Sequence, residues 1–133
     1  MKNLTNDSLR RKVSLPRRIS ARLKVRLKWK DNINGEDLSV CGVTENVGEM
    51  NTLVSLEVLP KVGSDVNLKL FYEDRAIIET LARVIRVERY PGKPLAALAI
   101  VENIELWQRR ALEAADSWLT RNLKLNYGEE GAN

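Results

Sequence analysis

The chain has 133 residues, which fits one domain and leaves little room for two. It has no histidine and one cysteine, which excludes the commonest general base, the usual catalytic triads, a Cys/His zinc cluster and an internal disulfide. The net charge of +4 is uneven: residues 1–30 carry eleven Lys or Arg and one acid, whereas residues 31–133 carry eleven and seventeen. The basic N-terminal segment therefore either meets something anionic or serves as a solvated tail.

Signals for membrane insertion and for enzyme chemistry are absent from the sequence. No run approaches the ~20 apolar residues of a membrane-spanning helix, and the N-terminus has no apolar stretch of signal-peptide type. A lone Cys41 fits a reducing cytoplasm, where we expect the chain to act away from membranes. Carboxylates and lysines show no paired spacing, so we expect no enzyme, no metal site and no cofactor.

The N-terminal third begins without a periodic pattern and then alternates. Residues 1–16 are polar and basic and are expected to form a disordered arm, and we expect no regular structure as far as residue 21. From Arg22 to Lys30 basic and apolar residues alternate strictly, which predicts a half-buried strand. The segment Asp31–Gly35 is predicted to be a turn, because Asn-Gly favours hairpins.

Five more strands are predicted from short apolar or alternating runs bounded by turn residues. They cover Leu38–Glu45, Thr52–Val58, Asp65–Tyr72, Ala76–Arg89 and Leu95–Val101. The polar segment Asn46–Asn51 is expected to interrupt the second and third strands. The last run is apolar throughout, which indicates burial on both faces.

After Asn103, a plausible helix N-cap, the apolar spacing becomes helical. The repeating residues are Trp107, Ala111, Ala114 and Trp118, which we expect to pack on the strands. The helix is expected to end between Asn122 and Leu125, leaving residues 125–133 as a disordered tail. Six strands followed by one helix predict a mainly-β domain over residues 17–124, a six-stranded antiparallel barrel with a C-terminal α-helix.

A cluster of arginines precedes the first predicted strand. The segment Pro16–Arg22 contains Arg18-x-x-x-Arg22, with Arg17 beside it. Guanidinium groups offer a planar fork to phosphate oxygens and to the O6/N7 edge of guanine, and they stack on bases. Such a loop suits a ligand with two phosphates and two guanines. The same spacing also arises by chance in basic tails, where the side chains are only solvated charges.

The arginine motif, the six predicted strands and the following helix resemble the PilZ family, from residue 16 to about residue 122. In that family an RxxxR motif lies in the loop entering the barrel. A second motif, (D/N)xSxxG, lies on the barrel and contacts a guanine of cyclic di-GMP. The resemblance implies that Arg17, Arg18 and Arg22 bind this dinucleotide.

The second motif has two candidate positions. One is Asn46-Val47-Gly48-Glu49-Met50-Asn51, where Gly48 replaces the serine and Asn51 the glycine. The lost hydroxyl removes about 0.5–1.5 kcal/mol, while Asn tolerates positive φ and Asn46 keeps an amide for a base edge. The other is the literal match Asp37–Gly42. We favour Asn46, Gly48 and Asn51 as site residues, because the literal match would nearly remove the second strand.

The resemblance implies a sensor or relay for cyclic di-GMP, whose arginine loop closes over the ligand and alters the surface seen by an unidentified downstream protein. The decayed second motif favours an alternative, a PilZ-like interaction adaptor that has lost ligand binding. A third hypothesis is non-specific nucleic-acid binding on an OB-like barrel. It is disfavoured because the chain has only one Phe and three Tyr for stacking.

Overall fold

The computed structural model describes residues 17–31, 33–90 and 92–132. Within these residues every paired strand is antiparallel. The elements in chain order are β1 (Arg18–Ile19), β2 (Lys24–Lys30), β3 (Asp37–Gly48), β4 (Asn51–Leu56), β5 (Asp65–Tyr72), β6 (Arg75–Tyr90), β7 (Lys93–Ile100) and α2 (Ile104–Ala132).

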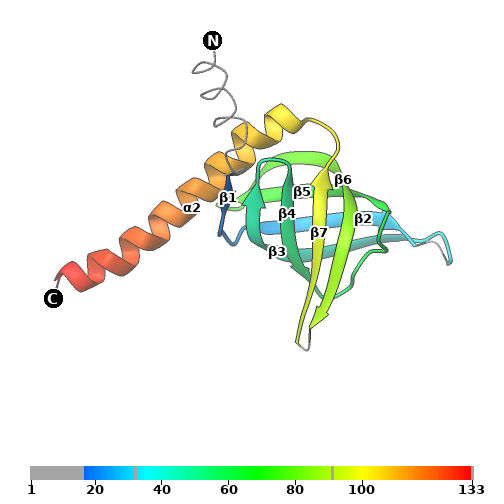
Figure 1. Cartoon of the computed structure of the whole chain (residues 1–133), viewed down its shortest axis with the longest axis horizontal. Helices are drawn as coiled ribbons and strands as arrows, with labels where there is room; N and C mark the ends of the chain where they lie inside the picture. The colour runs from blue at the N-terminus through cyan, green and yellow to red at the C-terminus, as the bar shows by residue number, and fades with distance from the viewer. Residues whose placement is uncertain (1–16, 32, 91, 133) are drawn as a thin grey trace, which may run out of the picture.

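Six of these strands close on themselves. They are hydrogen-bonded in the order β3-β2-β5-β6-β7-β4, and β4 pairs again with β3 (Figure 1). The short β1 adds to β3 outside this ring. The predicted six-stranded antiparallel barrel with a C-terminal helix is confirmed, and closure leaves the six strands without a long free edge.

Alternation along the strands fills the barrel. On β2, Val25 and Leu27 point inward and are buried, whereas Lys24 and Lys28 are exposed. The other strands supply inward-pointing residues in the same way, among them Val47, Val54, Val66, Leu68, Leu70, Ile78, Val84 and Leu98. The period-two pattern therefore places the charged row of β2 on the outside of the barrel.

The long strand β3 makes the corner that closes the barrel. It pairs with β2 up to Val43 and with β4 from Gly42 onward. A Cβ at Gly42 would overlap the Ser55 carbonyl oxygen, so only glycine lets β3 and β4 cross here. A bulge at Glu45 shifts the register just beyond the crossing and adds bend to the strand.

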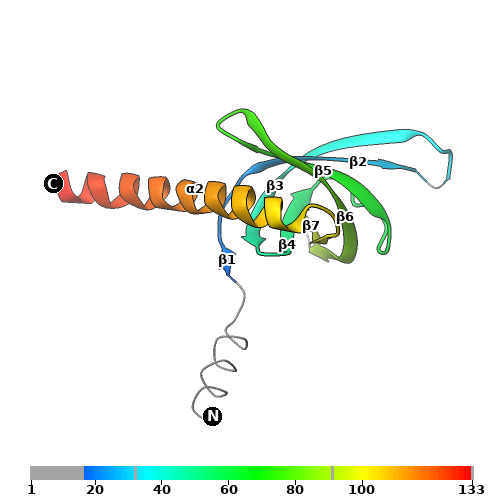
Figure 2. The same ribbon diagram turned by 90° about the horizontal axis from the view of Figure 1, so that it is seen from above.

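The helix α2 packs its first turns on the barrel and then leaves it. Its buried residues include Trp107, Ala111, Leu112, Ala114 and Ala115, as expected for a packing stripe. Figures 1 and 2 show the C-terminal part extending beyond the barrel. In the described part of the chain, no helix is both long enough and apolar enough to cross a membrane.

Several predicted boundaries are wrong. The second strand continues to Gly48, because main-chain pairing with β4 extends through residues that look like a loop in sequence. The arginine segment, expected to be irregular, contains β1. The helix runs to Ala132 through the predicted tail, since each added residue gains a main-chain bond and a helical Gly costs only about 1 kcal/mol. The predicted arm, residues 1–16, lies outside the described residues.

Candidate functional site

The arginine segment runs along the edge of β3. Arg18 pairs with Gly48 and Ile19 with Val47, so the start of the RxxxR motif lies directly beside the favoured second motif. Ile19 is buried and anchors β1, while the side chain of Arg18 is exposed. Two segments far apart in the sequence are thereby held together by main-chain pairing.

A buried threonine fixes the path of the chain between β1 and β2. Four residues follow Ile19 before Lys24, whereas only three separate their partners on β3, so the arginine segment bulges. Thr44 Oγ1 accepts a hydrogen bond from the Leu23 amide at 2.8 Å and donates to the Ala21 carbonyl at 2.6 Å. The Thr44 amide also donates to the Leu23 carbonyl at 2.9 Å. Because these bonds hold the residues on both sides of Arg22, Thr44 fixes the position of the Arg22 backbone within the bulge.

The favoured second motif covers the end of β3, the connection and the first residue of β4. Thr52 Oγ1 donates to the Asn46 carbonyl at 2.6 Å and holds the two strands in register. The indole Nε1 of Trp107 donates to the Gly48 carbonyl at 2.9 Å, in a fully buried contact. The helix is therefore attached to the backbone of the motif itself.

Three predicted site residues converge on one hollow. Arg18, Asn46 and Asn51 line it together with Leu53, Ile85 and Arg86, and its volume is about 80 Å³. In the part of the chain that the structure describes, the side chains of Arg18, Asn46 and Asn51 make no hydrogen bond or ion pair. The hollow thus presents one guanidinium and two amides whose polar ends are free to meet a ligand.

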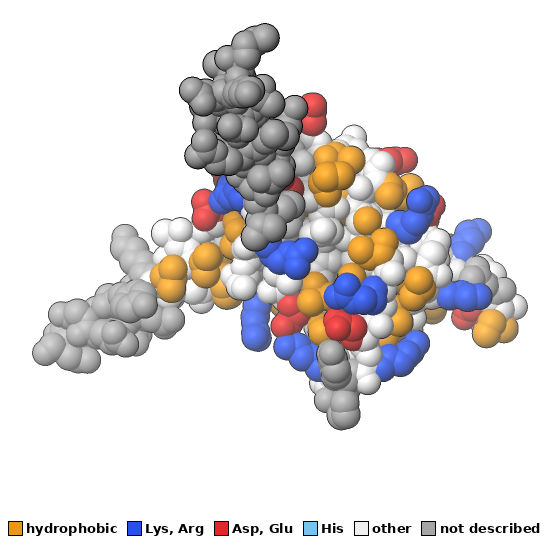
Figure 3. Space-filling view, in the orientation of Figure 1, with side chains coloured by type: hydrophobic (Ala, Val, Ile, Leu, Met, Phe, Trp, Pro, Cys, Tyr) orange, Lys and Arg blue, Asp and Glu red, His pale blue; other side chains and the backbone are white. Residues whose placement is uncertain are grey.

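The surroundings of this hollow combine apolar and basic groups. Leu53 of β4, Ala97 of β7 and Arg86 of β6 are cross-strand neighbours on the outer surface. Figure 3 shows apolar side chains interspersed with Lys and Arg on the face of the barrel that carries β4 and β7. Such a surface can contact a flat base while a cation meets an anionic group beside it.

The residues that depart from the family pattern lie against each other. A Cβ at Gly48 would overlap Oδ1 of Asn51. Gly48 is buried, and its φ does not lie in the left-handed region, so the lack of a side chain rather than the backbone conformation is what the site uses. The Asn51 amide occupies the space that a serine at position 48 would need.

The other two arginines point elsewhere. Arg22 lines a separate hollow of about 320 Å³ beside Trp118 and Arg121 of the helix. Arg17 lies 3.7 Å from the Asp116 carboxylate, in an exposed ion pair, and its amide donates to Glu49 at 3.4 Å. Pairing of β1 with β3 thus brings Arg18 to the second motif, whereas the side chains of Arg17 and Arg22 lie at the side of the helix.

The literal match, Asp37–Gly42, lies at the opposite end of β3 from Arg18. Its residues pair with β2 from Lys30 back to Val25. Ser39 and Cys41 are exposed on the outer face, and Gly42 is the crossing point with β4. The structure therefore brings the Asn46 position, and not the literal match, next to the start of the arginine motif.

Five residues that line the hollow were not predicted as site residues: Thr52, Leu53, Ile85, Arg86 and Ala97. Ile85 and Arg86 belong to a bulge of β6, where the register shifts between Val84 and Arg86. In the sequence, the alternation of apolar and polar residues breaks after Val84. This break alone does not show that Ile85 or Arg86 lies beside Asn51. Arg86 pairs with Glu88 at 3.5 Å, and both groups lie near the surface. No cluster of three potential metal ligands occurs in the described ranges.

Comparisons with known proteins rest on structure alone, since no family model and no curated protein matches the sequence. The fold is similar to the PilZ domain with c-di-GMP of YcgR from Escherichia coli, at 11% identity and TM-score 0.61, covering 87% of this chain and 98% of that one.

Two longer proteins contain a similar fold. YcgR of E. coli in complex with c-di-GMP matches at 10% identity and TM-score 0.60 over 91% of this chain. The inhibitor of motility MotI/DgrA from Bacillus subtilis matches at 21% identity and TM-score 0.55 over 84% of this chain. The chain spans about half the length of each, 51% and 52%. The closed six-stranded antiparallel barrel with one C-terminal helix therefore has the fold of a PilZ domain.

Proposed function

We propose that this chain is a sensor or relay domain that binds cyclic di-GMP, with the arginine loop closing over the dinucleotide. The observation that carries the proposal is the convergence of Arg18, Asn46 and Asn51 on one hollow with free polar ends. The shared fold with the PilZ domain of YcgR supports it. We further propose that the domain acts in the cytoplasm on a downstream protein and is not an enzyme.

Each group has a role that follows from its chemistry. Arg18 meets a phosphate oxygen or the O6/N7 edge of guanine, and the amides of Asn46 and Asn51 meet a base edge. The hollow of about 80 Å³ holds only part of a dinucleotide, so the ligand also covers the neighbouring surface. Arg86 adds a further guanidinium there.

Closure requires Arg17 and Arg22 to leave their positions beside the helix. The Arg17–Asp116 pair is exposed, with side chains 57% and 60% accessible, so breaking it costs no more than about 1 kcal/mol. A ligand that gains one charge-assisted contact, worth about 1.5–3 kcal/mol, offsets that loss. The exposed position of these arginines is therefore compatible with a loop that moves on binding.

The proposal is tested by calorimetric titration with cyclic di-GMP, beside cyclic di-AMP and GTP. Arg18→Ala and Arg22→Ala are each expected to weaken binding about tenfold or more, because each removes a bidentate, charge-assisted contact. Thermal stability should hardly change, since both side chains are exposed. The matched control is Arg109→Ala, an exposed arginine on the helix. Unchanged affinity in both arginine variants would refute the mechanism.

The adaptor without ligand is the second candidate, and the overlap between positions 48 and 51 favours it. The Asn51 side chain fills the place of a hydroxyl that the family motif uses. In that case, cyclic di-GMP at near-millimolar concentration leaves the amide spectrum unchanged. Shifts near Arg18 and Asn46 would eliminate the adaptor.

A further inference from the structure

A second surface of the barrel carries a row of cations that the candidate site does not use. Lys24, Arg26 and Lys28 alternate on the outer face of β2, and the register places Lys69 of β5 opposite Arg26. These four residues are here termed the basic face. Lys69 lies 3.7 Å from Glu79, whereas the three cations of β2 take part in no ion pair with a described residue.

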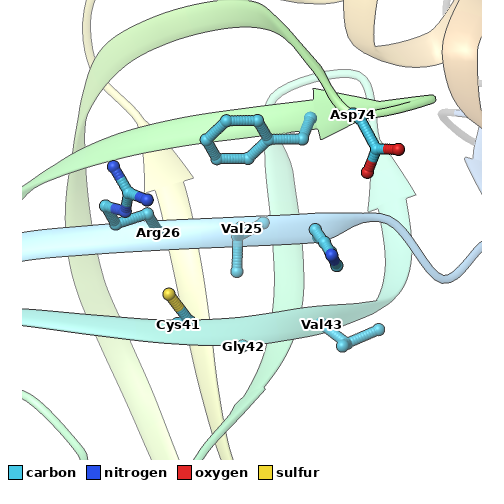
Figure 4. Close-up of a pocket in the computed structure, with 8 residues that line it drawn as sticks. Val25, Arg26, Cys41, Gly42, Val43 and Asp74 are labelled. Atoms are coloured by element: carbon cyan, nitrogen blue, oxygen red, sulfur yellow. The ribbon is translucent and has the colours of Figure 1, made fainter.

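A hollow of about 490 Å³ lies beside the basic face. Lys24 and Arg26 line it with Cys41, Val43, Phe71 and Asp74. Figure 4 shows Arg26, Cys41, Val43 and Asp74 around this hollow. Val43 is 38% exposed, although it is a large aliphatic residue on a strand. The hollow is large enough for one or two apolar side chains, with cations at its edge.

We propose that this surface docks an extended acidic segment of a partner protein, with an apolar side chain seated in the hollow. Alternate residues of an extended strand lie about 6.6–6.8 Å apart. Carboxylates at alternate positions of an extended segment therefore meet Lys24, Arg26 and Lys28 in sequence. Charge complementarity selects the partner and speeds its encounter, while the hollow supplies the contact that fixes the register.

The details of the hollow favour a protein over a nucleic acid. The guanidinium of Arg26 lies over the Phe71 ring, 5.7 Å from its centroid, so that ring is not free to stack on a base. Asp74 lines the hollow and would repel any anionic group placed inside it, phosphate or carboxylate. An apolar side chain flanked by carboxylates avoids both conflicts, because it fills the space near Val43 while its acidic neighbours meet the cations.

The docking hollow shares no lining residue with the hollow of Arg18, Asn46 and Asn51, whereas Lys24, Phe71 and Asp74 also line the hollow beside Arg22. The inference therefore does not depend on the proposed function. Arg18 and Asn46 can be altered without touching the basic face. Failure of ligand binding and failure of docking are thus separate results.

The test is an amide NMR titration of the full chain with two synthetic dodecapeptides of alternating Glu and Ser, one of which carries a central Leu. Shifts are expected at Lys24–Lys28, Cys41–Val43 and Phe71, with severalfold tighter binding of the Leu peptide. The double variant Lys24→Glu/Lys28→Glu should weaken that binding about tenfold or more, whereas the control Lys61→Glu should not. Val43→Asp should abolish the preference for Leu.

Each other outcome overturns the proposal. Stronger shifts of the same amides by a dT12 oligonucleotide or by phosphatidylglycerol vesicles would assign the face to a nucleic acid or a lipid surface. Self-association that disappears in the charge-reversal variant would assign it to a second copy of the chain. Equal affinity for the two peptides would exclude a role for the hollow. Peptide binding that survives charge reversal would exclude a role for the cations. A dispersed amide spectrum verifies that each variant is folded.

Discussion

Exchanging the residue types at positions 48 and 51 should reveal an energetic coupling between them. A Cβ at Gly48 would overlap Oδ1 of Asn51 and lie 3.3 Å from its carbonyl oxygen. Gly48→Ser therefore forces the Asn51 side chain from its place. Asn51→Gly removes the obstructing amide. The double variant carries the serine and glycine of the family motif at the two positions where this chain departs from it.

Two opposing effects should leave the free energy of unfolding almost unchanged in Gly48→Ser. Displacing Asn51 from its rotamer costs about 0.5–1.5 kcal/mol. Replacing a strand glycine lowers the backbone entropy of the unfolded chain and returns about 0.5–1 kcal/mol. Asn51→Gly alone loses about 0.5–1 kcal/mol for the same reason. In the double variant no Asn51 side chain has to be displaced, so this cost vanishes. The free energy of unfolding of the double variant should therefore exceed the value obtained by adding the two single effects by about 1 kcal/mol.

Urea denaturation of the four proteins measures this coupling without any ligand. Additivity within about 0.3–0.5 kcal/mol would show that the two positions do not compete for space. If cyclic di-GMP binds as proposed, Gly48→Ser should tighten binding about two- to tenfold through the added hydroxyl, and the double variant should gain less, because it also loses the Asn51 amide. Ser39→Ala should leave affinity unchanged. Loss of binding in Ser39→Ala would instead place the motif at Asp37–Gly42.

Two further changes test the supports of the site by urea denaturation. Thr44→Val leaves the Leu23 amide and the Ala21 carbonyl without partners and should destabilise by about 2–4 kcal/mol, whereas exposed Thr120→Val stays within about 0.5 kcal/mol. Similar losses in both variants would disprove the role of the buried hydroxyl. Trp107→Phe should lose about 2–4 kcal/mol, more than Trp118→Phe, because only the former removes a buried hydrogen bond. Equal losses would contradict this.

The barrel could be predicted because its strands alternate clearly. The rows Arg22–Lys30 and Asp65–Tyr72 need no tertiary information to be recognised as half-buried strands. The end of β3 could not be recognised, because Asn46–Gly48 has the composition of a loop and is a strand only through its pairing with β4. The end of the helix could not be predicted for a similar reason, since a glycine such as Gly128 is compatible with a helix end but does not require one.

The site could be predicted only in part. The resemblance to a family motif predicted Arg18 and Asn46 as site residues, and the structure shows them lining one hollow. The separate orientation of Arg22 could not be foreseen, because it depends on the bulge that Thr44 bridges. The contribution of Arg86 depends on a register shift in β6, which alternation alone does not locate.

Gly42 has a consequence for how short motifs are interpreted in small barrels. Its hydrogen is the only substituent that fits where β3 passes over Ser55 and Leu56. Closure of the ring of strands thus requires this glycine whether or not any nucleotide is bound. A pattern that ends in glycine can therefore match a strand crossing of this kind, and the match at Asp37–Gly42 needs no ligand to explain its glycine. The positions of such a pattern that bear on ligand binding are those whose side-chain polar atoms have no partner among the described residues. Here these are Asn46 and Asn51.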